Sequence, residues 1–225
     1  MIFNVNNIIR DVRVCLDENS SSTVLLLEGD EDTLRLNELI RSKIAESVDV
    51  VHRDAPYYLL EQGHNFGYDS FDEGSEAEEE VSIHWNGKDT CGYVMIPEDF
   101  HRLVVFDMSD WERPVYEAMS VLSTEYAKQR SRVKGVRGNA QRPVCVVAVR
   151  SVGRVLEFYS CKSQAAYVKQ AVYIPLAKID SEDNIDISRL CYRGVVYMIA
   201  SEVLMALGDG ERAAVMVAAA KNVLQ

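Results

Sequence analysis

Hydrophobic residues at the start of the chain recur every three or four positions, which is the spacing of one helix face. The pattern predicts a short helix over residues 3–18 and a longer helix from about 31 to 53. Acidic residues at 30–32 precede the second pattern, where side-chain acceptors and negative charge favour a helix start. Pro56 favours an end to that helix soon after residue 53.

The period changes in the middle of the chain, where short runs of β-branched and aromatic residues replace the helical spacing. These runs predict strands at residues 81–85, 91–96, 102–108, 144–150, 154–161 and 166–176. The turn residues at 151–153 predict that the fourth and fifth runs form a β-hairpin. Residues 112–119 and 124–130 are interpreted as short helices or turns, and 180–186 as a polar connector.

The last part of the chain predicts two helices joined by a Gly-Asp-Gly turn at residues 208–210. The first helix, 188–207, is apolar on nearly every side. We therefore expect it to be buried and to pack on the helix of residues 31–53. The second, 211–224, is rich in alanine, whose small side chain lets helices approach closely.

No loop follows the second of these helices in the sequence, so we expect its outer face to be open to a neighbouring subunit. The interface expected there is formed by Ala213, Val217, Ala220 and Leu224. The same pattern leaves open the alternative that the alanines pack inside the chain's own helical bundle.

The two ends of the chain share the helical period and the middle has another, which predicts the α+β class. We expect a helical bundle built from residues 1–60 and 185–225. A β-rich insertion with charged loops is expected over residues 61–184.

Composition limits the partners of this 225-residue chain, which carries a formal net charge of −11 at pH 7. That charge argues against a general nucleic-acid coat and against binding to anionic membranes. The sequence shows no signal peptide and no apolar run long enough to span a bilayer, so we expect no membrane partner. Five scattered cysteines without a CxxC pair indicate free thiols in a reducing compartment.

Catalytic and ligand-binding motifs are not found in the sequence. The four histidines lack metal-ligand spacing, and there is no nucleophile elbow, redox pair or phosphate-binding glycine loop. The acidic residues on either side of Trp111 are interpreted as an exposed turn. We therefore expect no enzyme, no cofactor and no metal. A pocket that brings His101 and Asp99 together with a cysteine would revive an enzymatic reading.

Two segments of opposite charge remain. Residues 68–80 contain seven acids and no base, whereas residues 128–142 contain six bases and no acid. Either segment alone is typical of a solvated surface, but together they can pair between copies, and heterologous contacts of this kind close rings. The basic segment could instead face DNA phosphate. The interface residues expected here are Glu76, Glu78, Glu79, Glu80, Arg130, Arg132, Lys134 and Arg137.

Two stretches of the chain are LLLEGDEDTLRLNELIRSKIAESVDVVHRDAP and IPEDFHRLVVF, the second with Pro97, Glu98, Asp99 and Phe100 at its turn. They resemble proteins that join the head to the tail in tailed bacteriophages. The resemblance is nearest to the tail tubular A type of adaptor in short-tailed phages. SDWERPVYEAM and GRVLEFYSC are similar to structural proteins of crAss-like phages, which infect gut Bacteroidales.

This resemblance implies a virion structural protein of the neck that forms a dodecameric ring below the portal. Its partners would be other copies of the chain, the portal protein and tail or neck proteins, and DNA would pass through the ring without sequence-specific contacts. One alternative is a tail or baseplate ring, or a tail-completion protein. An alternative from another class is a non-catalytic binding module of a bacterial cell.

Overall fold

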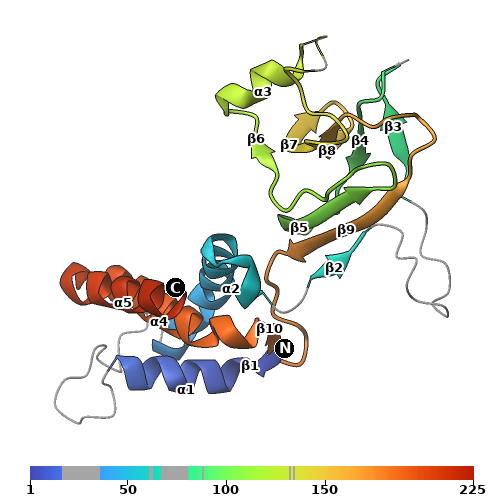
Figure 1. Ribbon diagram of the computed structural model, residues 1–225. Coiled ribbons are helices and arrows are strands. Elements are labelled where there is room, and N and C mark those ends of the chain that lie inside the picture. Colours follow the sequence, from blue (N-terminus) through green and yellow to red (C-terminus); the bar gives the residue numbers. More distant parts are fainter. Residues whose placement is uncertain (17–35, 61–62, 67–80, 88, 132, 134) are drawn as a thin grey trace. The chain divides into compact units, whose positions relative to one another are not determined.

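The computed structural model describes most of the chain in a mixed arrangement of helices and sheets, as expected for an α+β protein (Figure 1). The residues described are 1–16, 36–60, 63–66, 81–87, 89–131, 133 and 135–225. They form two compact units. The helical unit comprises residues 1–62 and 176–225, and the strand unit comprises residues 63–175.

The helical unit is held together by one apolar core to which all of its helices contribute. These helices are α1 (Val5–Cys15), α2 (Leu36–Asp54), α4 (Tyr192–Ala206) and α5 (Gly210–Val223). Apolar positions repeat at helical spacing along each of them and meet in the interior. Fully buried members of the core include Ile8, Ile40, Ile44, Ile199 and Leu204. Helix α4 packs against the other three, which confirms the expected packing on α2.

The turn between α4 and α5 is closed by a glycine, as the sequence predicts. Gly208 has a φ of +84°, which a side-chain-bearing residue rarely adopts. The N–H of Gly208 bonds to the carbonyl of Met205, and the N–H of Asp209 bonds to that of Leu204, which satisfies the end of α4. The Asp209 carboxylate then accepts from the N–H of Arg212 at 3.1 Å and caps α5.

Helices α4 and α5 lie side by side (Figure 1), and a second glycine permits their close contact. A Cβ atom added to Gly194 on α4 would lie 2.9 Å from the side chain of Leu224, just after the end of α5. The end of α5 therefore packs tightly on α4.

A two-stranded sheet joins the start of the chain to the segment that precedes α4. Strand β1 (Ile2–Asn4) pairs antiparallel with β10 (Asn184–Asp186). The sequence predicts a helix over residues 3–18 and a polar connector over 180–186, and it is wrong at residues 3–4 and 184–186, which form these strands. Asn4 accepts a hydrogen bond from the N–H of Asn6 at 3.0 Å, which caps α1 and moves its start to Val5.

In the described residues, the strand unit contains two sheets. The larger has the order β3 (Ile83–Trp85), β4 (Gly92–Met95), β8 (Gly153–Tyr159), β7 (Val144–Arg150) and β6 (Met119–Ser120). The smaller has the order β2 (His64–Asn65), β9 (Val168–Pro175) and β5 (Phe100–Met108). Strands β7 and β8 form the expected antiparallel hairpin.

Both sheets contribute to one apolar core of the strand unit. Leu156 and Phe158 alternate with neighbours on β8 and enter this core, where they meet Phe106 from β5 and Ala171 from β9. Two buried cysteines, Cys145 and Cys161, also lie in this core, and both are free thiols.

Two shorter segments of the strand unit, residues 112–119 and 124–130, are predicted from the sequence to be helices or turns. Residues 112–119 form no helix. Val115 instead exchanges backbone hydrogen bonds with Phe106 at 2.8 Å in both directions. The second segment does form a helix, α3 (Thr124–Gln129), capped by Ser123. Within the part of the chain that is described, no helix is long and apolar enough to cross a membrane.

Candidate functional site

A buried polar network lies under α3, on the face of the larger sheet opposite the apolar core. Glu157 of β8 points there and is 4% exposed. One of its carboxylate oxygens accepts from the hydroxyls of Tyr159 at 2.7 Å and Tyr126 at 3.2 Å. The other accepts from the Arg150 guanidinium at 2.7 Å and 2.8 Å. That guanidinium also lies over the Tyr93 ring, 4.3 Å from its centroid.

The hydrogen bonds that Glu157 accepts explain how a carboxylate can be buried in strand β8. Because both oxygens are satisfied, the desolvation cost of the charge is offset. Tyr126 belongs to α3, so the carboxylate also fixes that helix to the sheet. Burial and the nearby Glu157 raise the pKa of the Tyr159 hydroxyl, which therefore remains a donor at neutral pH. The network is suited to holding structure and leaves no free group for proton transfer.

Arg137, expected at a subunit interface, is committed within its own chain. Its guanidinium donates two bonds to the Asp89 carboxylate, both at 2.8 Å, and its side chain is 9% exposed. This pairing lowers the pKa of Asp89. Next to it, Gly138 fits closely, since an added Cβ would lie 2.7 Å from the Tyr159 carbonyl oxygen. Arg137 is therefore not available to a neighbouring copy.

The other residues of the two charged segments divide into exposed and undescribed ones. Arg130 is exposed, and its guanidinium lies 5.6 Å from the ring centroid of Tyr126. The remaining predicted members lie outside the described residues, namely Glu76, Glu78, Glu79, Glu80, Arg132 and Lys134.

The predicted interface residues of α5 lie mainly on its inner face. Ala213 and Ala220 are almost completely buried, and Leu224 is 9% exposed against Gly194. Val217 is partly buried. Because their own chain covers them, Ala213, Ala220 and Leu224 are in place to pack the helical unit, which is the alternative that the sequence pattern left open.

The outward face of α5 is formed by other residues, and the described part of the chain leaves them exposed. Val215 is 65% exposed, and Met205 near the end of α4 is 60% exposed. The exposed positions of α5 are Gly210, Glu211, Arg212, Ala214, Val215, Ala218, Lys221, Asn222 and Val223. A partner that reaches this helix would meet small and apolar side chains between an acid near its start and a lysine near its end.

The acids and thiols considered for catalysis have structural roles. Asp99 accepts from the Tyr173 hydroxyl at 2.9 Å, and burial together with Asp99 raises the pKa of Tyr173 to about 12. Asp110 accepts from the backbone N–H of Lys162 at 2.6 Å. Burial raises the pKa of Cys145 well above its usual value, which keeps this thiol protonated. Among the described residues, no cluster of histidine, cysteine and acidic side chains could hold a metal ion.

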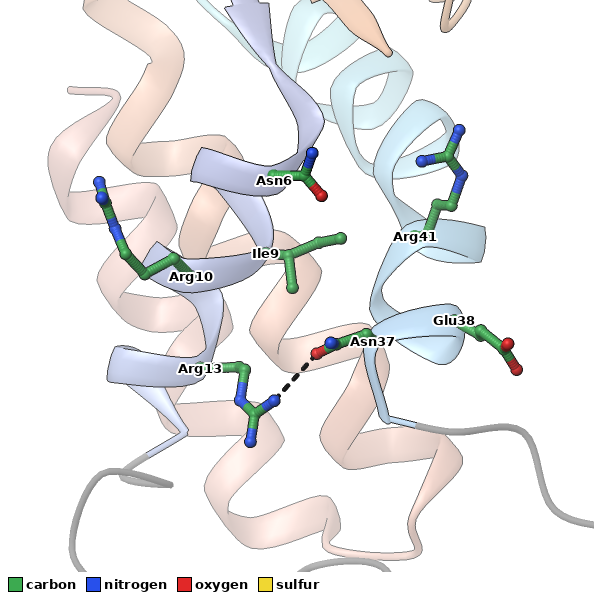
Figure 2. A pocket seen from close by; sticks show the side chains of 7 residues that line it. All are labelled: Asn6, Ile9, Arg10, Arg13, Asn37, Glu38 and Arg41. Carbon is green, nitrogen blue, oxygen red and sulfur yellow. Dashed lines mark hydrogen bonds between the residues drawn. The ribbon is translucent and has the colours of Figure 1, made fainter.

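An open cleft of about 490 Å³ lies between α1 and α2 (Figure 2). Its lining residues are Asn6, Ile9, Arg10, Arg13, Asn37, Glu38 and Arg41. Guanidinium and amide groups dominate this set, which suits it to carboxylate or phosphate ligands. The cleft was not predicted from the sequence, although Asn6, Arg10 and Arg13 recur at the spacing of one helix face. Arg41 lies opposite them on α2, and this placement depends on tertiary packing, which the local sequence pattern does not specify.

The chain was compared with protein-family models and with curated proteins, and neither comparison gave a significant match.

Proposed function

We propose that this chain is a virion structural protein, a head-to-tail adaptor that forms a dodecameric ring below the portal and acts without catalysis. The proposal rests on the resemblance of two chain segments to phage connector proteins. In this proposal the ring lies in the neck of the virion, and DNA passes through it.

The architecture that the proposal assigns is a helical bundle made from both ends of the chain, with the strand unit as an inserted domain. The chain leaves the helical unit after Gln62 and returns at Leu176, which fits this assignment. In this account the helices build the frame of the ring, because their core joins the first and last segments of the chain. The strand unit selects neighbours in the neck.

The observation that carries the assembly proposal is the outward face of α5. One side of this helix packs on α4, while Val215 on the other side is 65% exposed. Exposed apolar side chains beside small ones are suited to close helix packing between subunits. The ring contact is therefore assigned to Ala214, Val215 and Ala218 on this face.

Affinity purification with the portal and tail-tube proteins of the same virus tests the assigned position. The adaptor role predicts that the chain copurifies with the portal and that Val215→Glu reduces the number of bound copies. Val14→Glu is the matched control, because Val14 is 55% exposed and belongs to the same helical unit but lies on α1 and not on α5. Circular dichroism of both variants confirms that they remain folded.

Each outcome of this purification assigns a role. Capture by the tail tube alone would contradict the position below the portal and indicate a tail ring or tail-completion protein. A chain that is captured by neither and remains monomeric would indicate a binding module of the cell.

A further inference from the structure

We propose that the cleft between α1 and α2 binds an acidic protein segment, and that its occupant is the segment of residues 68–80 from a neighbouring copy. This inference rests on the proposed ring function and supplies the contact that sets the register between subunits. It assigns a site that the charge pattern of the sequence did not identify.

The two arginines that face the cleft lie toward its opposite ends, on different helices. Figure 2 shows Arg13 beside Asn37 at one end, Asn6 and Arg41 toward the other, and Ile9 between them. Nη1 of Arg13 donates to the Asn37 side-chain oxygen at 3.1 Å, which fixes the guanidinium at the mouth. An extended segment with several carboxylates can therefore meet one cation at each end and an apolar contact in the middle.

Donors remain available on Arg41 although it already has one carboxylate partner. One of its terminal nitrogens bonds to Asp183 at 2.5 Å, which lowers the pKa of that carboxyl. A guanidinium has five N–H donors, so this bond leaves others for a ligand. The Arg41 side chain is 41% exposed and can be reached from solvent.

The remaining charges around the cleft point outward or are paired. Arg10 extends away from α2 in Figure 2 and lies 3.4 Å from Asp11. Glu38 points away from α1 in the same view. The inner surface is therefore left to two arginines, two asparagines and one isoleucine.

Charge complementarity within the chain favours residues 68–80 as the occupant. This segment contains seven acids and no base. The sequence predicts the basic segment of residues 128–142 as the partner of these acids. The structure makes that segment a weaker candidate, because Arg137 is already bound to Asp89. A nucleic-acid ligand is less favoured, because the cleft lining has no aromatic side chain for a base to stack on.

A fluorescein-labelled peptide of residues 67–80 tests the cleft directly by fluorescence polarisation with the full chain. The peptide is expected to bind, with an affinity that falls as salt is raised. Arg13→Glu should weaken binding by about tenfold, and the milder Asn37→Asp should weaken it less. Arg53→Glu is the matched control, since Arg53 lies on α2, one of the two helices that line the cleft, but is not itself a cleft residue.

Three results of the peptide experiment would overturn the proposal. The first is equal binding by wild type and Arg13→Glu, both shown to be folded by circular dichroism. The second is loss of binding in Arg130→Glu alone, which would restore the basic segment as the partner. The third is displacement of the peptide by a DNA duplex but not by an acidic peptide of different sequence, which would make phosphate the ligand.

Mixing two complementary variants separates a neighbouring copy from the chain's own segment as the donor. One variant replaces Glu76, Glu78, Glu79 and Glu80 with lysine, and the other carries Arg13→Glu. Each should be defective in association by mass photometry, whereas the mixture, which has one intact contact, should form heterodimers. If the mixture remains monomeric while the peptide binds the cleft, the segment binds within its own chain and the proposal is wrong.

Failure of this inference and failure of the ring function give different results. A chain that forms rings on the portal regardless of Arg13→Glu keeps its function and loses this contact. A chain whose cleft binds the peptide, but which never associates with the portal, retains the site and loses the adaptor role.

Discussion

The helical unit and the strand unit bury different kinds of side chain. The helical core is filled mainly by aliphatic residues such as Ile44 and Ile199, both fully buried. The strand unit has a comparable apolar core on one face of its larger sheet, but on the other face it buries the charge of Glu157 beside Arg150. One unit is therefore stabilised mainly by packing, and the other by packing together with a charged hydrogen-bond network.

This difference can be measured because the two units have separate spectroscopic reporters. Both tryptophans, Trp85 and Trp111, lie in the strand unit, so tryptophan fluorescence reports on that unit alone. Circular dichroism at the helical minimum reports mainly on the helical unit, which contains the longer helices. Unfolding followed by both signals therefore reports on the two units separately.

The largest effect is expected from a cavity in the helical core. Ile199→Ala should lower the free energy of unfolding by about 3 kcal/mol, because it removes buried methyl groups at the centre of α4. Urea denaturation followed by circular dichroism measures the loss, and the fluorescence midpoint should change less. Val215→Ala is the control and should cost little, since Val215 is exposed. A loss below about 1 kcal/mol for Ile199→Ala would show that the core is loosely packed.

Removing the buried carboxylate should have the next largest effect. Glu157→Ala leaves Arg150 and two tyrosine hydroxyls without their acceptor and should destabilise the strand unit by about 2 kcal/mol. The loss should be seen in the fluorescence midpoint and not in the helical signal. Glu157→Gln, which retains one acceptor, should cost less. If Glu157→Ala shifts both signals equally, the two units unfold together and the comparison fails.

The smallest effect is expected from alkaline pH. The folded strand unit raises the pKa of Tyr173 to about 12 and raises that of Tyr159 as well. These groups are protonated in both states below pH ~10, and above it the unfolded state loses its protons first. Stability is therefore lost as the pH rises from ~10 through the folded pKa values. The helical unit has Tyr192, whose pKa is raised by burial and by Asp11.

A comparison of variants assigns the alkaline loss to one unit or the other. Tyr173→Phe should flatten the decline of the fluorescence midpoint between pH ~10 and 12, and Tyr192→Phe should flatten only the decline of the helical signal. Equal alkaline loss in all three proteins would show that these hydroxyls do not control the transition.

Helix positions and the β-hairpin could be predicted from sequence because their signals are local. The Gly-Asp-Gly turn and the alternation along 144–150 and 154–161 each depend on neighbouring residues. The β1–β10 pair was missed, because its strands are three residues long and far apart in the chain. No local period distinguishes such short strands from loops.

The candidate surfaces were harder to predict, because amphipathic spacing does not tell which face of a helix is covered. Alanines lie on both faces of α5, and Ala213 and Ala220, which the sequence pattern places at an interface, are buried by the chain itself. Packing of Ala213 in the helical core and contact of Leu224 with Gly194 of α4 fix the covered face, and both are tertiary. Arg137 was likewise assigned to an interface from its charge, while its partner Asp89 lies 48 positions away.

The central claim is that the chain assembles as a ring on a portal. Native mass measurement of the portal mixed with an excess of the chain tests it most directly. The account predicts a complex that contains a dodecamer of the chain for each portal ring, with fewer copies when Val215→Glu is used. A portal mass that does not change over the full range of added chain would contradict the account.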